Sequence, residues 1–268
     1  MNNFDDPNII NNLNYTPEKC IYTANTQDEV IELDLSKYDE VTVTSANNLT
    51  NPNIKYIPSG LISLATPIKG LLLAAPYSST LLTGKSINKK KLISTYRLPE
   101  DGYICLVAGL MNDNVLDEII DAIPTILETG GSIIIATLSN HRYIDKIKPY
   151  KDNPRVVFFD RNPSAAVIPL LLAGSDFYLH PNKSTMSNLI PLLAGAYGTT
   201  PIIGTETEFN DSDIIINNNY EEAIRCAADL YMNQPKQLAN MRKNIMESIP
   251  SWDDRKQAYI NLYENNKA

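Results

Sequence analysis

The polar side chains best placed to do chemistry follow short apolar segments in the second half of the chain. His180 ends one such segment, and Lys183, Ser184 and Thr185 come shortly after it, ahead of a helical pattern. The hydroxyls of Ser184, Thr185 and Ser187, near a helix N-terminus, could hold a sugar hydroxyl or a phosphate. Hydroxyls at such a position more commonly cap the helix. For His180 the alternative to an active-site role is a local hydrogen bond at a strand end.

Other titratable groups give weaker signals. Asp160 and Arg161 follow an apolar segment and could face a cleft, although a local salt bridge is the expected role. Cys20, Cys105 and Cys226 lie far apart without metal-ligand spacing, which predicts buried thiols in a reducing compartment. We therefore predict neither a metal nor a cofactor.

Composition narrows the function classes. The chain has 268 residues, 43% hydrophobic and 20% charged, which suits a soluble globular protein of one large or two small domains. A net charge of −8 argues against a nucleic-acid partner. Lys89–Lys91 is the only basic run and is expected to be a solvated helix face. The apolar runs are too short to cross a bilayer and no signal peptide is apparent, so we expect a cytoplasmic protein, in the host cytoplasm if it is viral.

From about residue 103 onward, apolar strand patterns alternate with helical ones. Strands are predicted at 103–109, 132–137, 155–159, 176–180, 201–203 and 213–216. Helices are predicted at 114–129, 140–150, 163–174 and 187–197, then 220–232, 235–248 and 252–265. This alternation predicts an α/β fold, a Rossmann-like parallel sheet with helices on both faces, whose ligands bind at the carboxyl ends of the strands.

Individual residues refine these boundaries. Asn162 is predicted to cap the helix 163–174, with Pro163 at its first position. Ser251 and Asp254 form a capping-box pattern before the last helix. Asn219 is predicted to cap the helix that follows it.

The first third of the chain is less regular. Strands are predicted at 38–45 and 53–60 and a helix at 88–96. We therefore divide the chain into four parts: a flexible tail (1–16), a small α/β segment (17–98), a Rossmann-like domain (99–250) and a C-terminal helix (251–268).

Several of these segments, taken in order, resemble one enzyme family. NKKKLISTYRLPEDGYICLVAGL (88–110) and SDFYLHPNKSTMSNLIPLLAGAYGTTPII (175–203) are similar to the C-terminal domain of glycogen and starch synthases, and the similarity runs over about residues 88–266. These are retaining glycosyltransferases of the GT-B architecture. The resemblance implies a GT-B C-terminal-type domain that holds a nucleotide-sugar donor, preceded by a remnant of the N-terminal domain or linker.

The same resemblance shows where the donor-binding residues should be. The family's arginine after the first strand falls at Gly109, and its lysine five residues later at Asn114. Its signature glutamate falls at Thr185, and the glycine opening the next helix at Asn188. Transfer needs cations for the departing diphosphate, a carboxylate near the sugar and glycines that let backbone N–H groups approach, and none of the four replacements keeps the required residue type.

The turn after the next strand departs in the same way. The paired glycines of the family fall at Thr207 and Glu208, close to Thr205, and acidic side chains there would repel a diphosphate. Lys183 is the one cation left near this site. The family holds the nucleotide base with backbone groups of a loop that corresponds to the region of Asp160. The vestigial donor site that the resemblance implies comprises Gly109, Asn114, Asp160, His180, Lys183, Ser184, Thr185, Asn188, Thr205 and Thr207.

The function predicted first is therefore that of a catalytically degenerate glycosyltransferase-like protein, a binding or scaffolding module. Residues 1–87 are too short for the family's N-terminal domain, so the last helix is expected to pack on residues 17–98 or on another molecule. A protein partner or a second copy would bind through those two regions, and weak nucleotide or carbohydrate binding stays open. One alternative is an active glycosyltransferase that uses non-standard residues or a partner chain. Another is a structural or assembly protein that reuses the fold.

Overall fold

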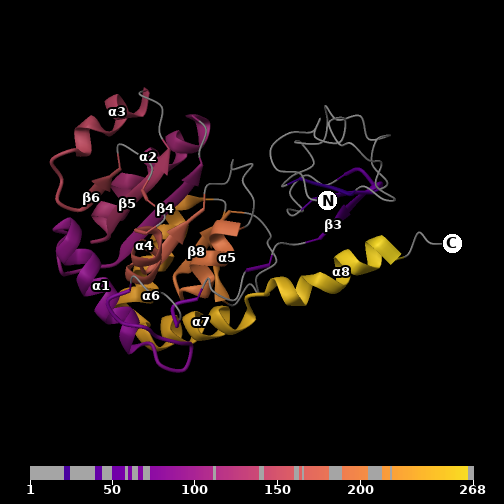
Figure 1. Cartoon of the computed structure of the whole chain (residues 1–268). Coiled ribbons are helices and arrows are strands. Elements are labelled where there is room, and N and C mark those ends of the chain that lie inside the picture. The colour runs from indigo at the N-terminus through magenta and orange to yellow at the C-terminus, as the bar shows by residue number, and fades with distance from the viewer. Residues whose placement is uncertain are drawn as a thin grey trace. The chain divides into compact units, whose positions relative to one another are not determined.

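The structure, a computed structural model, forms two compact units (Figure 1). It describes residues 21–24, 40–43, 50–57, 60–61, 66–68, 73–110, 113–138, 142–159, 163–164, 166–180, 189–204, 213–217 and 219–264. The larger unit comprises 63–184 and 190–249, and the smaller one comprises 1–62, 185–189 and 250–268. No helix among the described residues is long and apolar enough to cross a membrane.

A six-stranded parallel sheet organises the larger unit, in the order β6-β5-β4-β7-β8-β9. Its strands are β4 (Ile104–Leu110), β5 (Ser132–Leu138), β6 (Val156–Phe158), β7 (Phe177–Leu179), β8 (Thr200–Ile203) and β9 (Ile215–Ile216). The central strands are fully buried because helices cover both faces, as their continuous apolar sequences predict. The predicted Rossmann-like α/β fold is therefore confirmed.

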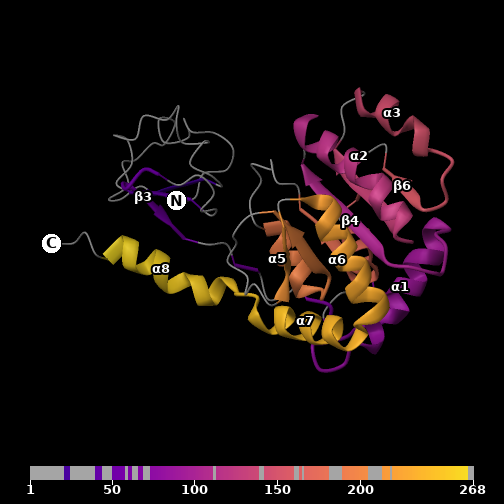
Figure 2. The same cartoon turned by 180° about the vertical axis from the view of Figure 1, so that it is seen from behind.

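Helices cover the two faces of this sheet, with α4 in front of it in Figure 1 and α6 in front of it in the reverse view of Figure 2. The helices are α1 (Thr83–Tyr96), α2 (Asp113–Glu128), α3 (Arg142–Ile147) with the 3₁₀ turn η4 (Lys148–Tyr150), α4 (Ile168–Gly174), α5 (Leu189–Ala196), α6 (Tyr220–Asn233) and α7 (Pro235–Ser248). α1 packs against α4, and α2 against α6. A Cβ at Gly174 would lie 2.6 Å from the Cβ of Leu92, so glycine permits the close contact of α1 with α4.

Two helix starts differ from prediction. Pro163 is not helical, and α4 begins at Ile168 with Pro169 in its first turn. Proline is favoured in the first turn of a helix, so Pro163 and Pro169 are equally suitable starts. The buried residues of α4 all follow Pro169. Asn162 lies outside the described residues. α1 begins at Thr83 rather than residue 88, and the five additional residues include Gly84 and Lys85, which are buried in the interior.

The smaller unit contains a three-stranded parallel sheet and the last helix. Its strands are β1 (Ile21–Ala24), β2 (Glu40–Val43) and β3 (Ile54–Tyr56), of which β1 was not predicted. α8 (Trp252–Glu264) packs through Leu262 and Tyr259 against Ile57, so the last helix lies on residues 17–98, one of its two expected places. The capping box before α8 is confirmed: Asp254 accepts hydrogen bonds from the Ser251 N–H and hydroxyl, and its own N–H donates to Ser251 Oγ.

Candidate functional site

The carboxyl edge of the larger sheet is where a ligand of this fold would bind. Gly109 lies near the end of β4 with φ +118°, a backbone conformation that side-chain-bearing residues rarely adopt. His180 follows the last residue of the neighbouring strand β7. The structure therefore places these two predicted residues at the expected edge of adjacent strands.

His180 is buried and electrically neutral near pH 7. Only 6% of the His180 surface is exposed, and this burial lowers the pKa of its imidazole to about 4. Its backbone is fixed at both ends: the N–H donates to the Ile202 carbonyl (2.9 Å) and the carbonyl accepts from the Tyr220 hydroxyl (2.6 Å). Its ring lies 6.1 Å from the ring of Tyr178, and within the described part of the chain Nδ1 has no hydrogen-bond partner.

A helix N-terminus at this edge already has its own acceptors. α6 begins just beyond β9, and the Asn219 side chain accepts from the N–H groups of Glu221 (3.0 Å) and Glu222 (3.5 Å), which confirms the predicted cap. Those two glutamates add negative charge to the first turn. Because two of its first-turn N–H groups are already bonded and two glutamates stand beside them, this helix end is unfavourable for a diphosphate.

Of the remaining predicted site residues, only Asn114 lies among the described ones. Asn114 is the second residue of α2, so its backbone is helical while its side chain lies outside the described set. The others that lie outside the described residues are Asp160, Lys183, Ser184, Thr185, Asn188, Thr205 and Thr207. Among the residues that the structure does describe, no group of histidine, cysteine, aspartate or glutamate is arranged to hold a metal ion.

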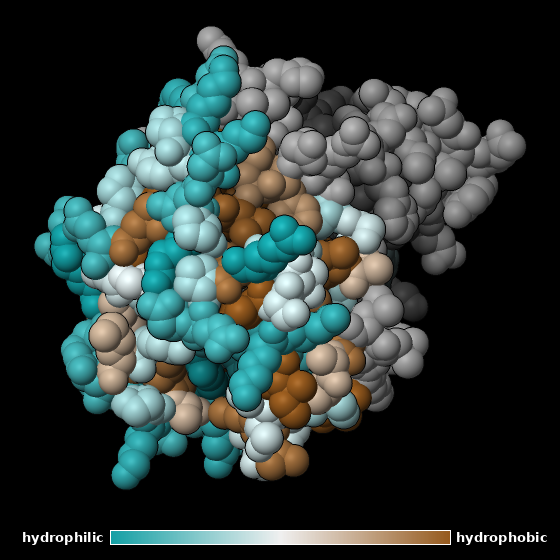
Figure 3. Space-filling view, turned by 90° about the vertical axis from the view of Figure 1, so that its left-hand side faces the viewer, coloured by the Kyte–Doolittle hydropathy of each residue, from teal (hydrophilic) through white to brown (hydrophobic). Residues whose placement is uncertain are grey.

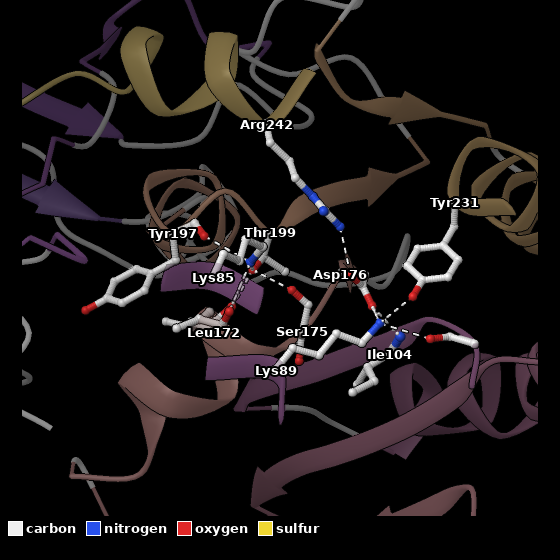
Figure 4. Close-up of polar contacts among 12 residues, drawn as sticks. Lys85, Lys89, Ile104, Leu172, Ser175, Asp176, Tyr197, Thr199, Tyr231 and Arg242 are labelled. Carbon is white, nitrogen blue, oxygen red and sulfur yellow. Dashed lines mark hydrogen bonds and ion pairs between the residues drawn. The ribbon is translucent and has the colours of Figure 1, made fainter. Parts of the chain in front are cut away.

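The opposite, amino edge of the sheet carries a buried ionic cluster that sequence reasoning missed. Asp176, just before β7, is 3% exposed and contacts both Lys89 of α1 (2.6 Å) and Arg242 of α7 (2.8 Å), as Figure 4 shows. Its Oδ2 also accepts from the Ile104 N–H (2.9 Å) at the start of β4. Burial raises the pKa of Asp176, but the two cations and these hydrogen bonds outweigh burial and hold the pKa below its usual value.

Lys89 is therefore not part of a solvated helix face, which corrects the prediction for Lys89–Lys91. Its ammonium also donates to the Gly102 carbonyl (2.9 Å) and the Tyr231 hydroxyl (2.8 Å) and lies 4.4 Å from the centre of the Tyr231 ring. Lys90 and Lys91 are exposed as expected.

Lys85, one turn before Lys89 on α1, joins the C-terminal ends of two helices (Figure 4). Its ammonium donates to the carbonyls of Ala173 (3.3 Å) and Tyr197 (3.1 Å) and to the Thr199 hydroxyl (2.9 Å). Unpaired carbonyls at helix ends attract a cation. Burial, and then the nearby Arg242, lower the pKa of Lys85 well below its usual value.

The charged cluster is therefore a structural feature and not a donor site. It joins α1, α7 and two strand starts, and it lies at the sheet edge opposite the strand ends. The one sequence signal of this cluster is the spacing of Lys85 and Lys89, which puts them on one side of a helix, but that spacing does not identify Asp176 as a partner. Of the cysteines, Cys105 is buried as predicted, Cys226 is exposed, which contradicts the prediction, and Cys20 lies outside the described residues.

Comparisons with known proteins point to one group. No protein-family model matches the chain. The glycogen synthase of Paracidovorax citrulli is 24% identical over 221 residues, which cover 75% of this chain and 44% of that enzyme. The glycogen synthase of Thermodesulfovibrio yellowstonii is 25% identical over 211 residues, covering 74% and 42%. The chain thus spans less than half the length of these relatives.

Solved structures agree on the fold. The catalytic domain of starch synthase IV from Arabidopsis thaliana, bound to ADP and acarbose, aligns with a TM-score of 0.69 and 18% identity over 85% of this chain and 56% of that one. WaaG, a glycosyltransferase of lipopolysaccharide biosynthesis, aligns with a TM-score of 0.62 and 12% identity over 91% and 75%. The chain therefore has a glycogen synthase-like fold of the GT-B glycosyltransferase type.

Proposed function

We propose that the chain is a catalytically degenerate glycosyltransferase-like protein that acts as a binding or scaffolding module. The observation that carries the proposal is the end of β4, where the resemblance to glycogen synthases expects an arginine. Gly109 stands there with φ +118°, so an arginine could not replace it without a change of backbone. The donor site therefore lacks more than the arginine side chain, because the backbone conformation at this strand end does not suit an arginine either.

Two further features of the carboxyl edge support the proposal. The first turn of α6 is capped by Asn219 and carries Glu221 and Glu222, so it disfavours a diphosphate. His180 is neutral near pH 7 because burial lowers its pKa to about 4, so it adds no positive charge. Stabilising a departing nucleoside diphosphate needs cations or free N–H groups. Of the predicted site residues whose side chains the structure describes at this edge, His180 supplies a neutral ring and Gly109 has no side chain.

An active glycosyltransferase is the second candidate. The 24% identity to a glycogen synthase over 221 residues favours it. The structural similarity to a starch synthase domain bound to ADP and acarbose identifies ADP as the nucleotide to test. Lys183 and Thr185 are the residues of this chain that would have to replace the missing donor contacts.

Isothermal titration with ADP, ADP-glucose and UDP-glucose separates the two candidates. For a degenerate module we expect dissociation constants no tighter than about 1 mM, equivalent to about 4 kcal/mol of binding free energy. The glycogen synthase of T. yellowstonii serves as the positive control. Micromolar binding of a nucleotide sugar that Lys183→Ala and Thr185→Val both abolish would contradict the proposal and favour the enzyme.

A further inference from the structure

Among the described strands, β6 stands at the edge of the six-stranded sheet, with β5 on one side only. Toward β5, the Arg155 carbonyl accepts from Ile133 N–H (2.8 Å) and the Phe159 N–H donates to the Ile135 carbonyl (3.0 Å). Since backbone direction alternates along a strand, the groups of Val156 and Phe158 point outward. The Val156 N–H already donates to the Asn153 carbonyl (3.0 Å). This leaves one outward donor, Phe158 N–H, and two outward carbonyls without partners among the described residues.

An apolar groove accompanies this edge. Figure 3 looks onto the side of the molecule that carries β6, and hydrophobic side chains gather there between hydrophilic ones. The groove has a volume of about 580 Å³. Its lining includes Ile147, Tyr150, Val156 and Phe158, with Lys148 and Lys151 at its rim. An unpaired strand edge beside an apolar groove is a template for a further strand.

The rim of the groove carries both signs of charge. Lys148 pairs with Asp145 (2.5 Å), and both side chains are mostly exposed. Lys151 and Asp152 are exposed as well, and neither has an ion-pair partner among the residues described. Two lysines and two aspartates therefore stand at one rim. A uniformly acidic or basic partner would meet like charges there, whereas a copy of the same rim carries both signs of charge.

We propose that β6 pairs antiparallel with β6 of a second copy of this chain, about a two-fold axis at Val157. In that register Phe158 N–H of each copy donates to the Val156 carbonyl of the other, so the free donor of each strand meets a free acceptor. The two six-stranded sheets then become continuous. A two-fold interface requires a self-complementary patch, and the outward backbone groups of β6 meet that requirement, while a rim with both signs of charge is compatible with it.

Sedimentation velocity on the full chain tests the proposal. Because β6 is three residues long, we expect a small interface and a dimer with a dissociation constant of about 10–100 µM. Val157→Lys, a charge of the kind that blocks pairing at strand edges, should leave only monomer up to about 300 µM. Met232→Lys is the matched control, since Met232 is 66% exposed on α6, and it should dimerise like the parent chain. Circular dichroism verifies that both variants are folded.

A charge exchange tests the pairing without disturbing the strand. Lys148→Glu with Lys151→Glu makes the rim entirely acidic, and Asp145→Lys with Asp152→Lys makes it entirely basic. Each variant alone should dimerise about tenfold more weakly, and an equimolar mixture should recover the parent affinity as a heterodimer.

Three results would overturn the proposal. The parent chain could be monomeric at every concentration. The dimer could persist in Val157→Lys and vanish in Tyr263→Lys, which would move the interface to α8. The mixed charge variants could associate no better than either alone.

Discussion

Asp176→Asn is the substitution that most directly tests why the larger unit is stable. Among the described residues, Asp176 is the carboxylate that contacts both Lys89 (2.6 Å) and Arg242 (2.8 Å), and it also accepts from the Ile104 N–H. Asparagine keeps the shape and removes the charge. Its amide can still accept from Ile104, but its NH₂ group would face a cation that is itself a donor.

The size of the loss follows from the burial of the three side chains. The Asp176 side chain is 4% exposed, and the side chains of Lys89 and Arg242 are 15% and 16% exposed. Removing one partner of a buried pair costs about 3–5 kcal/mol, because the other charge stays buried and uncompensated. The partial exposure of the two cations lets water relieve some of that penalty, so we expect about 3 kcal/mol. A domain of this size is stabilised by only about 5–15 kcal/mol in total.

Urea denaturation followed by far-UV circular dichroism measures this loss. Trp252, the only tryptophan, belongs to the smaller unit, so its fluorescence does not report on the site of the change. With a slope of about 2–3 kcal/mol per molar urea, the midpoint should fall by about 1 M. Asp101→Asn is the control, since Asp101 forms an exposed pair with Arg155 and its loss should leave the midpoint almost unchanged. Equal midpoints for the two variants would refute the structural role given to Asp176.

Three other predictions concern single side chains of the larger unit. His180 is neutral when folded, with a pKa of about 4 against 6.5 when unfolded, so its contribution is complete above pH 6.5 and is lost as the pH falls toward 4. Urea titrations should show about 2 kcal/mol less stability at about pH 5 than at about pH 7.5, a difference that His180→Gln abolishes. Gly109→Ala should cost about 1–3 kcal/mol in the same assay, because φ is +118°. Tyr77→Phe removes a buried hydrogen bond to the Tyr197 carbonyl (2.7 Å), so calorimetry should show a melting temperature lower by a few degrees.

Much of the fold could be predicted because its signals are local. Continuous apolar runs predict β4 and β5. The glycine pair after α2 predicts the end of that helix, where Gly130 adopts φ +79°. The start of α4 was predicted too early, since Pro163 and Pro169 give the same local signal and only packing on the sheet decides between them. β1 was missed, because a four-residue parallel strand depends on pairing with β2 rather than on its own sequence.

The candidate site was less predictable than the fold. Gly109 and His180 lie at the predicted sheet edge, since strand ends are set by the same local patterns. Lys89 was misassigned, because a run of three lysines says nothing about which one turns inward toward an aspartate 87 residues away. That choice depends on tertiary contacts, which no local pattern carries.

Transfer of radiolabelled glucose from ADP-glucose or UDP-glucose to a glycogen primer tests the central claim most directly. The purified chain is assayed beside the glycogen synthase of T. yellowstonii, a relative that is 25% identical over 211 residues. If the carboxyl edge has lost its donor chemistry, the chain incorporates no label above the protein-free blank. Incorporation that rises with the concentration of the chain and is lost in Lys183→Ala would contradict the claim.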